Sequence, residues 1–241
     1  STVPATGRGG VVSKPDVIAA LATPPARVTA PAPVGGAGRS AIGGKTVAVT
    51  GARETREKMS TRRKRIAENL LQAQHSTAHL TTFNEIDMTA ISALRARMKE
   101  KVEKEHGVKL SFMPFFAKAT VMALQAFPVV NAQVDGETIV YRHYVHLGIA
   151  VSSEAGLVVP NVKDADRHGV LGLSREIVAV ATRARDGKLT LDDLTGGTFT
   201  ITNGGVFGSL VSTPIINYPQ SAILGLHKMQ DRPVAVEGKV E

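Results

Sequence analysis

The chain of 241 residues contains no cysteine and no tryptophan, and only 4% of its residues are aromatic. Without cysteine it can form no disulfide bond, and it can offer neither a thiol nucleophile nor thiolate ligands for zinc or iron–sulfur clusters. It also lacks a run of about 18 apolar residues, and no signal peptide is recognisable at its start. These absences predict a protein of a cytosol-like compartment with no membrane partner. Since 43% of the residues are hydrophobic, the core should consist mainly of aliphatic side chains.

Positive charge exceeds negative charge, with 29 Lys and Arg against 21 Asp and Glu. Much of the excess lies in one segment, whose basic residues are Arg53, Arg56, Lys58, Arg62, Arg63, Lys64 and Arg65. A charged run of this kind is usually a solvated helix face. Neither aromatic stacking residues nor a known nucleic-acid module accompany it, so no nucleic-acid partner is expected. The alternative is a phosphate-binding pocket or an anionic protein partner, with Arg63, Lys64 and Arg65 as candidate phosphate ligands.

The composition divides the chain into three parts. Residues 1–22 combine a Gly-rich turn with a short helix that Ser13 caps ahead of Pro15, which indicates a small, incomplete unit. Residues 23–53 are rich in Ala, Pro and Gly and cannot bury enough apolar area to fold, so they are predicted to form an extended linker. The globular body should span residues 54–241.

Within this body, helix and strand patterns alternate. The predicted helices cover residues 60–74, 87–107, 111–127 and 173–185, and the predicted strands cover residues 79–88, 145–151, 156–162, 198–203 and 221–227. Asp135 and Gly136 mark a hairpin turn. In the third helix, the side chains expected to face inward are those of Phe115, Ala119, Met122 and Ala126. The pattern predicts an α+β fold with one large sheet and packed helices.

No common catalytic motif is evident from local spacing. The seven histidines do not have the spacing of a zinc site, so no metal is expected. His227 lies four residues before Asp231, as a general base held by a carboxylate would. The charged neighbours Lys228 and Arg232 favour a solvated strand end instead, and His227 is therefore not assigned a catalytic role. A nucleophile elbow, a phosphate loop and a dinucleotide fingerprint are all missing from the sequence.

Long segments do resemble a known family. "MSTRRKRIAENLLQAQHSTAHLTTFNEIDM" and "DGKLTLDDLTGGTFTITNGGVFGSLVSTPIINYPQSAILGLHKMQDRP" are similar to segments of the acyltransferases that form the cores of 2-oxo acid dehydrogenase complexes. The resemblance covers essentially all of residues 57–241. Within the family, "LTTFNEIDM" and "ITNGGVFGSLVSTPIIN" resemble the succinyltransferases more than the acetyltransferases. Residues 1–22 resemble the second half of the family's peripheral-subunit-binding domain, which a Pro/Ala linker follows.

The resemblance implies a fold of the chloramphenicol-acetyltransferase type, with a two-layer core and a large mixed sheet. This fold forms trimers and, in succinyltransferases, usually a cube of twenty-four chains. The implied reaction moves a succinyl group to coenzyme A from a lipoyl arm, which a separate lipoyl domain carries. The Thr202 hydroxyl corresponds to the family's oxyanion donor. Gly204, Gly205, Gly208 and Ser212 would line the channel in which the two arms meet.

The resemblance also implies partners and a location. The 2-oxo acid dehydrogenase and dihydrolipoamide dehydrogenase subunits would bind through the partial binding domain, residues 1–22. A bacterial protein of this family works in the cytoplasm, and a eukaryotic one works in the mitochondrial matrix.

The sequence departs from the family pattern in one respect that concerns catalysis. The family's base is a histidine in a D-H-R-x-x-D-G signature, and this signature does not occur in residues 1–241. We expect that histidine and its aspartate to lie beyond Glu241, so that the chain is a fragment that is inactive alone. Three interpretations stay open: a succinyltransferase core, an acetyl or branched-chain acyl transferase core, and a truncated scaffold chain without catalysis.

Overall fold

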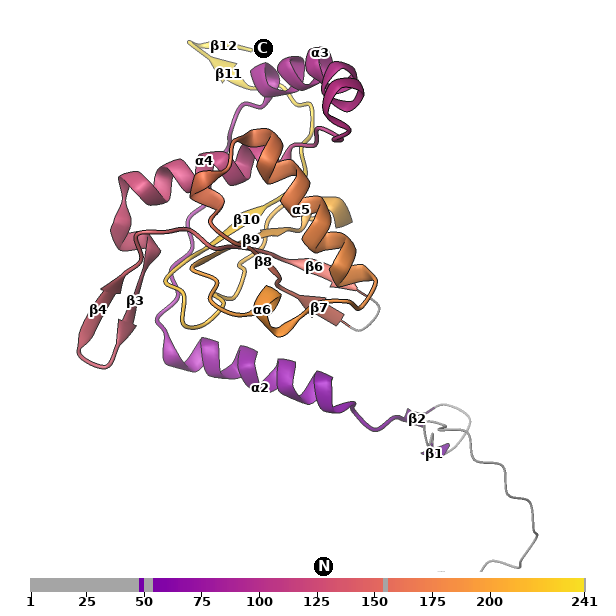
Figure 1. Cartoon of the computed structure of the whole chain (residues 1–241), viewed down its shortest axis with the longest axis vertical. Coiled ribbons are helices and arrows are strands. Elements are labelled where there is room, and N and C mark those ends of the chain that lie inside the picture. Colours follow the sequence, from indigo (N-terminus) through magenta and orange to yellow (C-terminus); the bar gives the residue numbers. More distant parts are fainter. Residues whose placement is uncertain (1–47, 50–53, 154–155, 241) are drawn as a thin grey trace, which may run out of the picture. The chain divides into compact units, whose positions relative to one another are not determined.

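The computed structural model describes residues 48–49, 54–153 and 156–240 (Figure 1). It divides into two compact units, residues 1–57 and residues 58–241. In the first unit, strand β1 (Ala48–Val49) pairs antiparallel with strand β2 (Thr55–Arg56). Strand β1 therefore lies inside the predicted linker, and β2 lies at the start of the predicted body. The partial binding domain predicted over residues 1–22 and the rest of that linker lie outside the described residues.

The second unit contains the four predicted helices. Their bounds are Thr61–Ser76 for α2, Thr89–His106 for α3, Met113–Ala126 for α4 and Val170–Arg185 for α5. The Ser60 hydroxyl caps α2 by accepting a hydrogen bond from the amide of Arg63. Gly107, with φ of 64°, ends α3 in the left-handed conformation that glycine adopts without strain. Shorter helical elements are α6 (Leu191–Leu194), η1 (Pro128–Asn131), η2 (Ala165–Arg167) and η3 (Gly205–Phe207).

The main sheet has four strands in the order β10-β9-β5-β8. Their bounds are Ile223–Leu226 for β10, Phe199–Asn203 for β9, Leu147–Ile149 for β5 and Asn161–Val162 for β8. β9 runs parallel to both β10 and β5, whereas β8 is antiparallel to β5, so the sheet is mixed. Its residues come from segments far apart in sequence, and helices pack against it. The predicted α+β fold class is confirmed.

Three further strand pairs are two-stranded and antiparallel. The pairs are β3 (Ala132–Asp135) with β4 (Thr138–Tyr141), β6 (Val151–Ser153) with β7 (Gly156–Val158), and β11 (Ala235–Val236) with β12 (Lys239–Val240). The first pair is the predicted hairpin, and Gly136 supplies the positive φ that its two-residue turn requires. This hairpin stands to one side of the main sheet (Figure 1).

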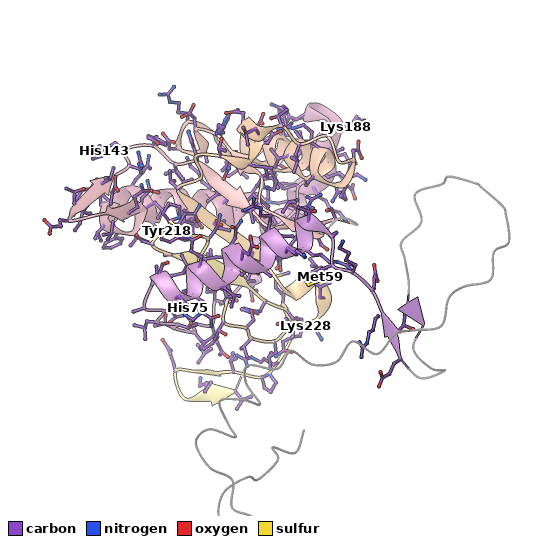
Figure 2. The ribbon with its side chains drawn as sticks, turned by 90° about the horizontal axis from the view of Figure 1, so that it is seen from below. Met59, His75, His143, Lys188, Tyr218 and Lys228 are labelled. Atoms are coloured by element: carbon purple, nitrogen blue, oxygen red, sulfur yellow. The ribbon has the colours of Figure 1, made fainter. Side chains whose placement is uncertain are left out.

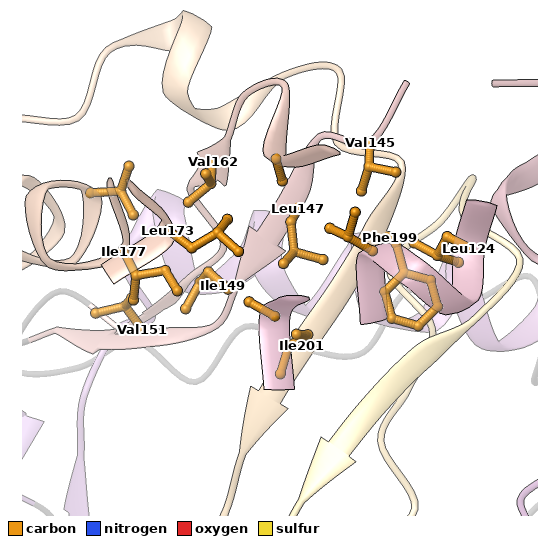
Figure 3. Close-up of a cluster of buried hydrophobic side chains, with 14 of the residues drawn as sticks. Leu124, Val145, Leu147, Ile149, Val151, Val162, Leu173, Ile177, Phe199 and Ile201 are labelled. Atoms are coloured by element: carbon orange, nitrogen blue, oxygen red, sulfur yellow. The ribbon is translucent and has the colours of Figure 1, made fainter. Parts of the chain in front are cut away.

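The hydrophobic core lies between the sheet and two helices. Leu147 of β5 and Ile201 of β9 are completely buried, and they pack with side chains of α4 and α5 such as Leu124 and Leu173 (Figure 3). Helices α4 and α5 lie together over this face in Figure 1, and α2 lies on the other side of the unit. Figure 2 shows α2 from that other side, with Met59 near its first turn and His75 near its last. None of the helices in the described ranges is long and apolar enough to span a membrane.

The strand predicted over residues 79–88 is wrong. The segment from residue 77 to residue 88 has no regular structure, and no strand within the described ranges pairs with it. Its large apolar side chains, Leu80, Phe83 and Ile86, recur every third residue rather than every second one. A strand would place such side chains on alternate faces, and in the structure all three are exposed.

The inward face predicted for α4 is wrong at three of its four positions, since Ala119, Met122 and Ala126 are exposed while Phe115 packs against a small second core cluster. Met122 was expected inside but is 60% exposed, and the buried positions are Pro114, Ala117, Thr120, Val121 and Leu124. The helix sequence MPFFAKATVMALQA carries a single charged residue and is apolar on every side. Periodicity therefore could not distinguish the face that packs on the sheet and α5 from its neighbours.

Candidate functional site

The two faces of the main sheet carry different side chains. Side chains alternate along a strand, so Phe199 and Ile201 face the helices while Thr198, Thr200 and Thr202 face the other side. Residues directly opposite one another on neighbouring strands share a face. The apolar face therefore consists of Leu147, Ile149, Phe199, Ile201 and their neighbours. The opposite face, called the polar face below, consists of Gly148, Asn161, Thr198, Thr200, Thr202 and Gly225, together with Ile223 opposite Thr200.

In the middle of the polar face, Thr200 is buried and its hydroxyl is hydrogen-bonded. It is 1% exposed, and its hydroxyl donates to Oε1 of Gln220 over 2.6 Å. Gln220 is itself buried, and it belongs to the irregular segment from residue 211 to residue 222 that covers this face. The hydrogen bond therefore holds that segment against β9. A partner twenty residues away leaves no local signal, so the sequence alone does not predict this contact.

Thr202 lies two residues further along β9 and differs from Thr200 in its surroundings. It is half-buried, and its hydroxyl has no hydrogen-bond partner among the described residues. Its neighbour on β10 is Gly225. A Cβ atom at Gly225 would lie 3.0 Å from Cγ of Pro214 and 3.3 Å from Cε1 of His227. The unbonded hydroxyl of Thr202 is therefore next to Gly225, and the side chains of Pro214 and His227 lie close to this glycine.

The imidazole belongs to a second polar pair. Nε2 of His227 lies 2.8 Å from Oγ of Ser212, and which atom donates depends on the histidine tautomer. His227 follows Gly225 by two residues, so it extends from the same face of the sheet as Thr202. Sequence reasoning had proposed Ser212 for substrate binding and had taken His227 for a solvated strand end. The structure brings the two together across fifteen residues, because the irregular segment that contains Ser212 folds back toward the end of β10.

A tight turn, residues 203–209, follows β9 and contains the three glycines predicted to contact substrate. The amide of Gly204 donates to the carbonyl oxygen of Leu226, and the amide of Gly205 donates to Oδ1 of Asn203, both over 2.9 Å. Gly208 has φ of 80° and open space around it. The backbone of His227 fills the space beside Gly205, so packing within the chain already explains why this position has no side chain. Contact of these glycines with substrate stays a prediction.

The three candidate phosphate ligands lie on a different element. Arg63, Lys64 and Arg65 are exposed in the first turn of α2, and Arg65 pairs with Glu68 over 3.6 Å. The first turn of this helix has no acidic residue. The dipole gives the N-terminus of a helix a partial positive charge, which favours anions there. Basic side chains at this end add to that positive charge. The arrangement is compatible with a phosphate, and it stays a prediction.

One half-buried ion pair stabilises the segment that leads into β9. Both carboxylate oxygens of Asp193 accept hydrogen bonds from Arg183 of α5, with the shorter contact at 2.6 Å. Asp193 also accepts from the amide of Thr190 in a capping box. The Arg183 hydrogen bond, followed by that of the Thr190 amide, lowers the pKa of Asp193 to about 2. In the described part of the chain, His, Asp and Glu do not group into a set of three that could hold a metal.

Comparison with known proteins gives consistent matches. Residues 51–241 match the family described as 2-oxoacid dehydrogenases acyltransferase (catalytic domain). The dihydrolipoyllysine-residue succinyltransferase component of the 2-oxoglutarate dehydrogenase complex of Escherichia coli (strain K12) is 50% identical over the whole chain, which covers 58% of that protein. The corresponding protein of Rickettsia bellii is 47% identical, again over the whole chain and 57% of its own length. The chain thus spans less than three fifths of these relatives.

Solved structures agree with these matches. A probable dihydrolipoamide acetyltransferase from Listeria monocytogenes superposes with a TM-score of 0.76 at 34% identity, covering 79% of this chain and 82% of that one. The cubic core of a pyruvate dehydrogenase multienzyme complex superposes with a TM-score of 0.73 at 35% identity, covering 77% and 76%. The chain therefore belongs to the 2-oxoacid dehydrogenase acyltransferase family, as its motifs had predicted, and carries the fold of that family's catalytic domain.

Proposed function

We propose that the chain is part of a dihydrolipoyllysine-residue succinyltransferase, which moves a succinyl group from a lipoyl arm to coenzyme A in a 2-oxoglutarate dehydrogenase complex. The names of the Escherichia coli and Rickettsia bellii relatives support the activity and the complex. The observation that carries the proposal is a single polar patch. It joins the unengaged hydroxyl of Thr202 to the Ser212–His227 pair on one face of the sheet.

Thr202 has the properties of an oxyanion donor. In acyl transfer to a thiol, the thioester carbonyl oxygen gains negative charge as the new carbon–sulfur bond forms, and loses it when the old bond breaks. A preorganised hydroxyl without another partner can donate to that oxygen, and such a donor acts mainly on the transition state. The hydroxyl of Thr200 is committed to Gln220. Of these two threonines on β9, Thr202 is therefore the better candidate for the oxyanion donor.

The Ser212–His227 pair explains a preference for succinyl. A succinyl group ends in a carboxylate, which accepts hydrogen bonds from a hydroxyl and from a ring N–H of histidine. The pair lies on the face that carries Thr202, at the end of the neighbouring strand. An acetyl or branched-chain acyl group has no terminal charge for these groups to bind. The pair therefore favours the succinyl alternative among the acyl groups that the sequence leaves open.

Self-association follows from the same relatives and from exposed apolar residues. The solved cubic core supports a symmetric assembly of trimers, which we extend to a cube of twenty-four copies. Side chains such as Leu80, at 89% exposed, and Phe207, at 77% exposed, would be covered in such an assembly. Residues 1–22 would bind the 2-oxo acid dehydrogenase and dihydrolipoamide dehydrogenase subunits. The cytoplasm of a bacterium, or the mitochondrial matrix, is the proposed location.

Coenzyme A and the lipoyl arm are substrates in this proposal. Coenzyme A supplies the attacking thiol, and the lipoyl arm, on its separate domain, supplies the thioester. Arg63, Lys64 and Arg65 are proposed to bind the coenzyme A phosphates. Their side chains are exposed, and no acidic residue in the first turn neutralises the positive end of the helix dipole. Gly204, Gly205 and Gly208 are proposed to border the channel.

The test is acyl selectivity in the full-length enzyme. We compare kcat/KM for succinyl and acetyl dihydrolipoamide in the wild type and in Ser212→Ala. Removing a hydrogen bond to a charged group costs roughly 1.5–3 kcal/mol, so succinyl transfer should fall by about 10- to 150-fold while acetyl transfer changes little. Thr213→Ala is the matched control, because it removes an exposed neighbouring hydroxyl. A wild-type enzyme that prefers acetyl, or a Ser212 variant that loses both activities equally, would contradict the proposal.

A further inference from the structure

We infer that Gly205 is a positioning residue: its missing side chain lets the turn after β9 press against the His227–Lys228 peptide, and this contact holds the His227 imidazole against Ser212. The inference rests on the proposed function, in which that pair binds the acyl carboxylate. It adds a role for Gly205 that depends on contacts within the chain and not on contact with the acyl group or the reacting atoms.

Hydrogen bonds tie the turn and the end of β10 together on both sides of His227. Before His227, the carbonyl oxygen of Leu226 accepts from the amide of Gly204 over 2.9 Å. After His227, the amide of Lys228 donates to the carbonyl oxygen of Ser209 over 2.9 Å. The backbone of His227 is therefore located by the turn from both directions, although the histidine lies beyond the last residue of β10.

Between these two hydrogen bonds the surfaces meet at Gly205. A Cβ atom built there would overlap the carbonyl group of His227, with the carbonyl carbon 2.5 Å away and the amide nitrogen of Lys228 2.8 Å away. All of these are backbone atoms, which cannot swing aside as the end of a flexible side chain could. Any side chain at position 205 must push the His227–Lys228 peptide away from the turn.

Such a displacement would act on the pair because its contact is short. The Ser212–His227 hydrogen bond spans 2.8 Å and joins segments fifteen residues apart, so its length depends on where the backbone of His227 lies. The Asn203 side chain supports the same geometry, since its Oδ1 accepts from the amide of Gly205 over 2.9 Å. By contrast, a Cβ atom at Gly204 would meet first the Ser209 side chain, at 3.2 Å. Of these two glycines, Gly205 is the one at which an added Cβ atom would overlap the backbone of His227.

The experiment measures the reactivity of His227 toward diethylpyrocarbonate, which modifies an unprotonated imidazole nitrogen. The ligand-free, full-length enzyme is treated briefly, and the modification rate at each histidine is read from its peptide by mass spectrometry. Gly205→Ala should raise the rate at His227 by about two- to ten-fold, the size of one lost hydrogen bond. Ser212→Ala, which removes the partner directly, should give a similar rise. The rate at exposed His106 should stay unchanged as an internal reference.

Gly169→Ala is the matched control, because its added methyl group meets nothing within 4 Å and its φ of −76° suits alanine. It should leave His227 at the wild-type rate. If Gly205→Ala fails to assemble, Asn203→Ala loosens the same turn without adding an atom at position 205, and a smaller rise at His227 is expected. An unchanged His227 rate in an assembled variant overturns the inference, whatever its activity. The proposed function is judged separately, by the acyl selectivity of Ser212→Ala.

Discussion

The two faces of the main sheet use the same strands for different purposes. On the apolar face, Leu147 and Ile201 are completely buried under α4 and α5, which are regular helices. On the polar face, Thr200, Thr202 and Gly225 lie beneath an irregular segment that is rich in small residues. Regular elements provide close apolar packing, whereas an irregular cover can bring single polar groups to chosen points of a rigid sheet.

The contacts on the two faces also explain why a segment of twenty residues, 198–217, contains no charge and is rich in glycine, serine and threonine. Part of it is the strand β9, whose inner residues face the core. The rest turns back and packs its own backbone against β10, where Gly205 meets His227. Small residues are thus required by contacts within the chain, before any contact with substrate is considered.

Loss of volume on the apolar face should give the largest effect on stability. Ile201→Ala empties space in a fully buried position and should lower the free energy of unfolding by about 2–5 kcal/mol. The molecules that remain folded should keep their acyl selectivity, because the polar face is intact. Thermal melting of the full-length protein gives the stability, and Val178→Ala, on the exposed side of α5, is the control with little expected change. Equal melting temperatures for the two variants would contradict the assignment of the core.

Thr202→Val should give the largest effect on catalysis. It removes the unengaged hydroxyl and keeps both shape and strand propensity, so kcat should fall by about 10²–10³ with little change in substrate binding. Since the hydroxyl has no partner within the described residues, melting should barely change. The measurement is kcat and KM of Thr202→Val and of the wild type, from steady-state kinetics of the complete enzyme. A kcat within a few-fold of wild type in a folded assembly would remove Thr202 from the mechanism.

Thr200→Val should show the opposite pattern, although the two residues share a face of one strand. The substitution deprives the buried Oε1 of Gln220 of its donor, which should cost about 1–3 kcal/mol of stability. Turnover by the folded enzyme should stay close to normal. The same two measurements are made on both variants, so each serves as the other's control. A Thr200 variant that melts normally but turns over slowly would mean that the two threonine assignments are reversed.

Much of the fold could be predicted from the sequence, because its helices carry local signals. Ser60 and Gly107 are end signals of the kind that a single chain reveals, and both lie where predicted. The inward face of α4 could not be predicted, since the helix is apolar all round. Residues 79–88 were taken for a strand although no neighbouring strand pairs with them in the described part of the structure.

The candidate site was less accessible to sequence reasoning. Thr202 was identified only through the family resemblance, because an unengaged threonine looks like any other strand residue. The role of Ser212 was proposed without its partner. His227 was set aside because its charged neighbours are adjacent in sequence, whereas its contact to Ser212 depends on how the irregular segment between β9 and β10 folds back. Contacts between segments far apart in sequence leave no periodic pattern. The close approach of Gly205 to the backbone of His227 is another such contact.

The smallest expected effect comes from the ion pair that leads into β9, and it belongs to neither face. The pKa of Asp193 is about 2 in the folded protein, below its ordinary value of 3.8. A depressed carboxylate pKa stabilises the fold above the ordinary value, and this contribution disappears as the pH falls from about 5 to 2. Because the Arg183 side chain is 39% exposed, solvent screening reduces the contribution to about 1–2 kcal/mol.

Asp193→Asn keeps the shape and can still accept from the Thr190 amide, but it removes the charge that Arg183 binds. The variant should therefore melt below the wild type at pH 7, and the difference should shrink toward zero near pH 2. Asp192→Asn, whose side chain is 84% exposed, should show no more than a few tenths of a kcal/mol at any pH. Acyl selectivity should be unchanged in both variants, since neither side chain hydrogen-bonds to Thr202, Ser212 or His227. A gap between Asp193→Asn and wild type that stays constant from pH 7 to pH 2 would show that the carboxylate's charge is not what stabilises this segment.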